Sequence, residues 1–81
     1  MGSSRPQPRR LAVKLRRIRM KLQLTQEQMA ALVRHRSSPV YPGNISEFEA
    51  GRREPSLLVL LKYARAAGVT ADALIDDELD V

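Results

Sequence analysis

The chain has 81 residues and a formal net charge of +5, with no cysteine and one histidine. This length fits one small domain. Without a thiol and with a single imidazole, the sequence predicts no disulfide, no metal site and no cofactor. No apolar run approaches the ~20 residues that a membrane-spanning helix needs, and no secretory signal is recognisable, so we expect a cytoplasmic protein without membrane contact.

The charge is distributed unevenly along the chain. Residues 1–40 carry ten Lys or Arg and a single acid, Glu27, whereas residues 41–81 carry four Lys or Arg and eight acids. Such polarity favours a polyanionic partner at one end of the molecule and a different partner at the other. A well-solvated surface is the alternative interpretation.

The first eight residues contain Gly, Ser and Pro without an apolar pattern, which predicts a mobile N-terminal arm. A first helix is predicted from Arg9 to Leu22, because apolar residues recur there on one helical face. These residues are Leu11, Leu15, Ile18 and Leu22. A cationic stripe with the same spacing consists of Arg10, Lys14, Arg17 and Lys21. The stripe is interpreted as a solvated surface, as a phosphate contact or, least well, as part of an organelle transit peptide.

A second helix is predicted after Thr25, which is a good N-cap and forms a capping box with Gln28. It runs to about Val33 or Arg34, with Met29, Leu32 and Val33 facing inward.

Prolines, a glycine and paired serines make residues 34–43 a loop. A third helix is then predicted from about residues 42–44 to Ala50, with Ile45 and Phe48 facing the core. Gly51 stands where a left-handed C-cap belongs.

A fourth helix is predicted to open at Pro55-Ser56 and to end at Gly68. Its expected buried face is Leu57, Leu60, Leu61, Ala64 and Ala67. Thr70 is expected to cap a fifth helix that ends near Ile75, with Val69 and Leu74 closing the core. No period-two strand pattern is present, so the fold class is all-α with five helices. The acidic residues 77–81 are expected to fray as a solvated tail.

Three motifs carry a resemblance to a known family. They are Leu-Thr-Gln-Glu-x-Met-Ala from Leu24, Ile-Ser-x-Phe-Glu-x-Gly-Arg-Arg-x-Pro-Ser-Leu from Ile45, and Leu-Leu-x-Tyr-Ala-x-Ala-x-Gly-Val from Leu60. In this order they resemble the helix-turn-helix domains of the lambda-repressor/Cro type, also called the XRE family, over residues 9–76. The resemblance implies a five-helix DNA-binding domain whose third helix enters the major groove, and dimeric operator binding in many members.

The resemblance also assigns roles to individual positions. It implies phosphate contacts by Gln26, Arg52 and Arg53. It implies base contacts at the start of the third helix, by Tyr41, Gly43, Asn44, Ser46 and Glu47. Arg19 and Glu49 correspond to a buried structural ion pair. The loop Arg34–Val40 is longer than the turn usual in the family, and it either adds phosphate contacts through Arg34 and Arg36 or is a floppy excursion.

The residues at the start of the third helix allow several interpretations. Asn44 can pair with adenine and Glu47 can accept from cytosine N4. Alternatively, Asn44 and Glu47 form a capping box, or Glu47 simply faces solvent. Tyr41 either stacks on a base or covers the loop.

A second surface is predicted from apolar residues outside the expected core. Leu58, Val59 and Leu79 suggest a dimer interface, with a merely apolar helix edge as the alternative. We therefore predict a sequence-specific transcription regulator, a repressor or autoregulator, that binds double-stranded DNA as a homodimer in the nucleoid. A toxin or another regulator is a further candidate partner.

The alternative function is a protein-interaction adaptor or antitoxin-like partner that keeps the fold without reading DNA. An enzyme is not expected, because His35, Ser37 and Ser38 lack the neighbours that would activate them.

Overall fold

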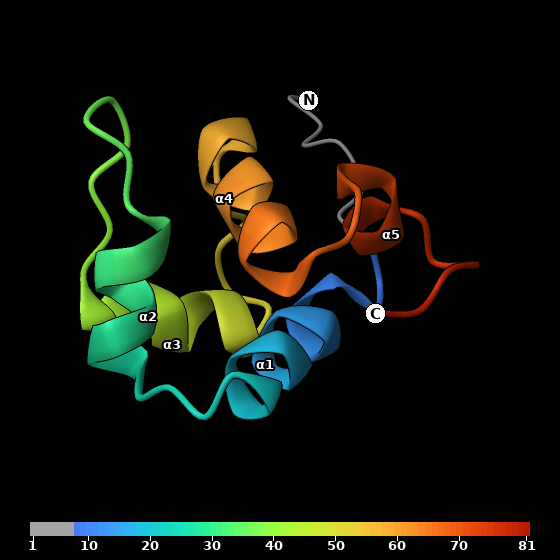
Figure 1. Ribbon diagram of the computed structural model, residues 1–81, viewed down its shortest axis with the longest axis horizontal. Coiled ribbons are helices and arrows are strands. Elements are labelled where there is room, and N and C mark those ends of the chain that lie inside the picture. Colours follow the sequence, from blue (N-terminus) through green and yellow to red (C-terminus); the bar gives the residue numbers. More distant parts are fainter. Residues whose placement is uncertain (1–7) are drawn as a thin grey trace.

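The computed structural model describes residues 8–81, and within them the chain folds into five α-helices, in the predicted order (Figure 1). They are α1 (Leu11–Lys21), α2 (Gln26–Val33), α3 (Pro42–Glu49), α4 (Leu57–Ala67) and α5 (Ala71–Ile75). The all-α prediction is confirmed. The arm predicted for residues 1–8 lies, except for Pro8, outside the described residues. None of the helices described is long and apolar enough to cross a membrane.

The core forms where α2 packs against α3 and α4, α1 packs against α3, and α5 closes one side against α4 and α1. Its most deeply buried side chains come from all five helices. Leu15, Met29, Val33, Ile45, Tyr63 and Leu74 each have 0% of their surface exposed. Because α3 shares its apolar face with both α1 and α2, the rest of that helix is available to solvent or a partner.

The predicted inner faces of α2 and α4 are partly wrong. Leu32 is 46% exposed, and Ala30 is buried in its place. On α4, Leu57 is 75% exposed, while Val59 and Tyr63 are buried. The physical reason is that α1, α2 and α5 all pack against α4, so these contacts set its rotation about its axis. Leu22 and Leu61 are also on the exposed side, each at 37%.

The predicted signals at the start of α2 and at the ends of α3 and α4 are confirmed. Thr25 Oγ1 accepts the N–H of Gln28 at 3.1 Å, and Gln28 Oε1 accepts the N–H of Thr25 at 2.9 Å, which completes the capping box. Gly51 and Gly68 adopt φ values of +75° and +70°, a left-handed conformation that glycine reaches without a Cβ penalty. Thr70 is the N-cap residue of α5, although its hydroxyl makes no capping hydrogen bond.

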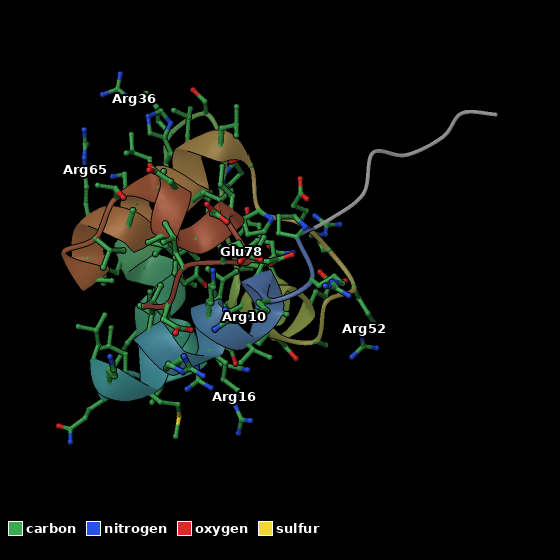
Figure 2. All side chains as sticks on the ribbon, turned by 90° about the vertical axis from the view of Figure 1, so that its right-hand side faces the viewer. Arg10, Arg16, Arg36, Arg52, Arg65 and Glu78 are labelled. Carbon is green, nitrogen blue, oxygen red and sulfur yellow. The ribbon has the colours of Figure 1, made fainter. Side chains whose placement is uncertain are left out.

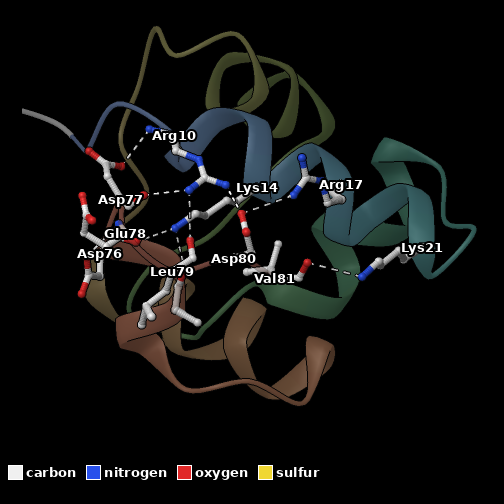
Figure 3. Close-up of polar contacts among 11 residues, drawn as sticks. Arg10, Lys14, Arg17, Lys21, Asp76, Asp77, Glu78, Leu79, Asp80 and Val81 are labelled. Atoms are coloured by element: carbon white, nitrogen blue, oxygen red, sulfur yellow. Dashed lines mark hydrogen bonds and ion pairs between the residues drawn. The ribbon is translucent and has the colours of Figure 1, made fainter.

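The acidic C-terminal segment does not fray but lies along α1, as Figure 3 shows. Lys14 is 0% exposed, and its ammonium donates to the carbonyl oxygens of Ala73 at 2.8 Å and Asp76 at 2.7 Å. The guanidinium of Arg10 donates to the Asp77 carbonyl at 2.7 Å and pairs with the Asp80 carboxylate. The prediction that the tail frays is therefore wrong, although the side chains of Asp76, Glu78 and Asp80 remain exposed to solvent as predicted.

The Asp77 carboxylate also binds the backbone just before α1. It accepts the backbone N–H groups of Arg9 and Arg10, each at 3.0 Å. These bonds, the one from Arg10 first, lower the pKa of Asp77, and the side-chain hydrogen bond from Arg10 lowers the pKa of Asp80. At the other end of the stripe, Lys21 donates to the Val81 carbonyl oxygen at 3.4 Å. Arg10 and Lys14 are therefore engaged within the molecule, which corrects the interpretation of that half of the stripe as a solvated or phosphate-binding surface. Arg17 and Lys21 remain exposed.

Candidate nucleic-acid interface

Residues at the start of α3 hydrogen-bond to one another. Tyr41 is the N-cap residue, and its N–H donates to Asn44 Oδ1 at 2.9 Å, while the N–H of Asn44 donates to the Tyr41 carbonyl at 2.8 Å. Pro42 follows as the first helical residue, where its fixed φ and missing N–H cost nothing. The predicted capping box between Asn44 and Glu47 is therefore wrong, because the helix begins at Pro42 and Asn44 is already inside it.

Glu47 lies one turn beyond Asn44 and is held on its Oε1 atom. Asn44 Nδ2 donates to this oxygen at 3.2 Å, and Arg53 Nε lies 3.4 Å from it. The side chains of Arg53 and Glu47 are 59% and 42% exposed, so this pair sits at the surface. Residues Tyr41, Asn44 and Glu47 thus form one connected row along α3.

The remaining residues predicted at this edge are open to solvent to different degrees. Tyr41 is 66% exposed and Gly43 is exposed, with nothing within 4 Å of the position that a Cβ would take. Ser46 is half-buried. The leading edge of α3 is consequently not shut away inside the fold.

An ion pair fixes the other end of α3. Arg19 Nε donates to Glu49 Oε2 at 2.6 Å, and Arg19 Nη2 donates to Glu49 Oε1 at 3.0 Å. The side chains are only 13% and 7% exposed, and Arg19 also donates to the Leu24 carbonyl at 3.0 Å. The side-chain hydrogen bond that Arg19 donates to Glu49 raises the pKa of Arg19. The pair joins α1, the entry to α2 and the last residue of α3 in one fixed arrangement.

Gln26, the first residue of α2, lies beside this pair. Its Nε2 atom is 3.5 Å from Glu49 Oε1, at the limit of a hydrogen bond. The side chain is half-buried, and the second N–H of its amide takes no part in this contact, so it can still reach a phosphate.

Tyr63 was not predicted to take part in this region. Its side chain is fully buried, and its hydroxyl has no hydrogen-bond partner among the described residues. Burial raises the pKa of Tyr63 well above its usual range, and the charge of Glu49 adds to this effect. The helical spacing of Val59, Leu60 and Tyr63 is the sequence signal that could have placed it in the core.

The insertion Arg34–Val40 is an ordered turn rather than a floppy excursion. The backbones of His35 and Ser38 exchange hydrogen bonds of 3.2 and 2.8 Å, and the Ser37 N–H donates to His35 Nδ1 at 3.0 Å. Ser38 Oγ accepts from Ser56 Oγ at 3.0 Å, and Val40 is 7% exposed. Figure 1 shows the turn extending away from α3, so it does not cover the leading edge.

The four arginines predicted to bind phosphate form two separate groups. Arg34 and Arg36 belong to the insertion, whereas Arg52 and Arg53 follow α3, and all four are exposed. Figure 2 shows Arg36 and Arg52 on opposite sides of the molecule. The structure therefore does not bring the arginines predicted to bind phosphate into a single patch.

The predicted dimer surface needs one correction. Val59 is 1% exposed, because its side chain packs into the core beside Leu60 and Ala64. It is therefore not available to a second subunit. Leu58 and Leu79 are 40% and 41% exposed and remain accessible.

Comparisons with known proteins agree with this architecture. Residues 13–79 match the family described as "Helix-turn-helix domain". The P22 c2 repressor protein, solved in complex with synthetic operator 9T in the presence of Tl⁺, is similar with 25% sequence identity and a TM-score of 0.70, over 83% of this chain and 94% of that chain. The clp gene regulator ClgR from Corynebacterium glutamicum is similar with 28% identity and a TM-score of 0.66, over 83% of this chain and 66% of that chain. No curated protein sequence matches this chain.

Fold and family match together define a helix-turn-helix protein in the class of DNA-binding transcription regulators. The chain belongs to the lambda-repressor/Cro, or XRE, type of this family.

Proposed function

We propose that the chain is a sequence-specific DNA-binding repressor or autoregulator that places the start of α3 in the major groove of double-stranded DNA. The observation that carries this proposal is an exposed leading edge on a rigidly held helix. Tyr41 is 66% exposed at one end of α3, while Glu49 at the other end is clamped by Arg19. A helix presented in this way reads base edges without first having to be ordered.

Contacts to the bases are proposed for the leading edge of α3, and contacts to phosphates for the residues around it. The base-contacting residues are Tyr41, Gly43, Asn44, Ser46 and Glu47. The phosphate-contacting residues are Gln26, Arg52 and Arg53 next to α3, with Arg34 and Arg36 reaching phosphates farther along the duplex. Phosphate contacts fix the position of the protein, and base contacts give sequence preference.

The protein is proposed to act as a homodimer at the nucleoid in the cytoplasm. Leu58 and Leu79 supply exposed apolar surface for a second copy. A two-fold dimer would read two half-sites about 34 Å apart, one helical turn of DNA.

Duplex binding measured over a range of salt concentrations tests the proposal. Each phosphate neutralised contributes about −0.9 to the slope of log K against log salt. Arg52→Ala should therefore make the slope shallower by about 0.9. Arg36→Ala should also make the slope shallower, because Arg36 is proposed to contact a phosphate, and an unchanged slope would refute that contact.

Arg65→Ala provides the charge-matched control, because Arg65 is exposed on α4 and lies on the opposite side of the molecule from Arg52 (Figure 2). It should leave the slope unchanged. Weak binding that is indifferent to sequence even at low salt would refute the regulator function and favour a protein-interaction adaptor.

A further inference from the structure

The orientation of the Asn44 side chain is fixed by two different neighbours. Its Oδ1 accepts the Tyr41 N–H at 2.9 Å, and its Nδ2 donates to Glu47 Oε1 at 3.2 Å. Exchanging the amide oxygen and nitrogen would place a donor against an N–H group and an acceptor against a carboxylate, so only one orientation satisfies both contacts.

This arrangement limits what Asn44 can read. Pairing with adenine in the major groove needs the amide oxygen and one amide hydrogen together, the first for N6 and the second for N7. Here the oxygen faces the backbone of Tyr41, at the N-cap of α3. A bidentate pair would have to use the second lone pair of Oδ1 and the second N–H of Nδ2, because the first of each is already engaged with Tyr41 and Glu47.

Glu47, unlike Asn44, keeps one side-chain oxygen outside these contacts. Both of its contacts use Oε1, from Asn44 Nδ2 at 3.2 Å and from Arg53 Nε at 3.4 Å. Oε2 takes no part in these two contacts, and 42% of the side chain is exposed. An acceptor oriented in this way requires an amino group on the base opposite it and is repelled by a keto oxygen.

Arg53 resolves the difficulty of placing a carboxylate close to DNA phosphates. Its Nε faces Glu47, while the terminal guanidinium nitrogens carry four further N–H bonds that can bind a phosphate. Such a contact would bring the positive charge of Arg53 between Glu47 and the DNA phosphate, which reduces the repulsion that an isolated carboxylate would meet.

From this geometry we infer that Glu47 determines base preference by accepting from the N4 amino group of a cytosine, and that Asn44 and Arg53 are positioning residues that hold its carboxylate. The inference rests on the proposed function and makes it more specific. It replaces adenine reading by Asn44 with cytosine reading by Glu47.

Selection of bound sequences from a random duplex pool tests the inference. The unaltered protein should select a motif with a cytosine at one defined position. Glu47→Gln should lower the preference for that cytosine by about tenfold. It should also move the preference toward adenine, because a Gln amide donates one hydrogen bond to adenine and accepts another from it. Circular dichroism of each variant checks that it is folded.

Two further variants separate positioning from reading. Asn44→Ala and Arg53→Ala should weaken the preference at the same position that Glu47→Gln alters. The matched control is Arg52→Ala, which removes the neighbouring exposed charge and should lower affinity for all sequences alike. Loss of an adenine preference at a different position in Asn44→Ala would overturn the inference, because Asn44 would then be the reader.

The outcomes also distinguish a failure of this inference from a failure of the proposed DNA-reading function. A pool in which the unaltered protein selects no motif refutes the DNA-reading function itself. A clear motif that Glu47→Gln leaves unchanged supports that function and refutes the role of Glu47.

Discussion

Removal of one member of the Arg19–Glu49 pair should cost a large part of the stability of the fold. At an effective dielectric constant of about 20, unit charges roughly 3 Å apart attract each other by about 5–6 kcal/mol, a gain that desolvation largely offsets. The two side chains are 13% and 7% exposed, so water cannot replace a missing partner. Arg19→Met or Glu49→Met should therefore lower the free energy of unfolding by about 3–5 kcal/mol.

That loss is large for a chain of this size, whose total stability is expected to be about 4–12 kcal/mol. Urea denaturation followed by circular dichroism measures it directly. With a slope of about 1 kcal/mol per molar urea, the midpoint of each single variant should fall by about 3 M or more. A variant already unfolded without urea would agree with the expectation.

The double variant and a surface control decide whether the mechanism is correct. Replacing both residues removes both buried charges, so Arg19→Met with Glu49→Met should cost clearly less than the sum of the single changes. Arg53→Met at the exposed pair with Glu47 should cost less than about 1 kcal/mol. Additive effects at Arg19 and Glu49, or single losses as small as that of Arg53→Met, would refute the reasoning.

Three further expectations concern the C-terminal segment and the core. The pKa values of Asp77 and Asp80 are lowered in the folded state, so the stability that these residues contribute is present above about pH 4 and is lost as the pH falls further. Asp77→Asn should therefore lose less stability against urea between neutral and acidic pH than the unaltered protein does. An equal loss in both proteins would contradict the Asp77 contact. Tyr63→Phe removes a buried hydroxyl without a partner among the described residues and should raise the free energy of unfolding by about 1 kcal/mol, whereas a decrease would indicate an interaction of that hydroxyl not seen here. Lys14→Met removes two buried hydrogen bonds and should destabilise by about 2–3 kcal/mol in the same assay, against less than about 0.5 kcal/mol for the exposed Lys21→Met, and similar values for both would argue against the burial of Lys14.

The sequence predicted what depends on local spacing. Thr25 with Gln28 located the start of α2, and Gly51 and Gly68 located two helix ends, because caps and turns involve residues close in sequence. The rotation of α4 could not be predicted in this way. Its leucine-rich sequence allows more than one apolar face, and contacts with three other helices select the face that contains Val59 and Tyr63.

Contacts between distant segments were also beyond the reach of the sequence pattern. Arg10 and Asp77 are 67 positions apart, and nothing in a stripe of cations or a run of acids indicates that they meet. At the interface, the motif located the start of α3, and Glu47 was recognised as a candidate. The contact of Arg53 with Glu47 was not predicted, because Arg53 lies beyond the glycine turn that ends the helix.

The contacts of α1 with the C-terminal segment have a consequence for shortened forms of the domain. Asp77 accepts the backbone N–H groups that precede α1, and the buried Lys14 donates to the carbonyl oxygens of Ala73 and Asp76. A chain cut after Ile75 would keep all five helices, but it would lose Asp77 and one of the two acceptors of Lys14. The stretch after the last helix therefore belongs to the folded unit, and a minimal fragment of this domain has to include it.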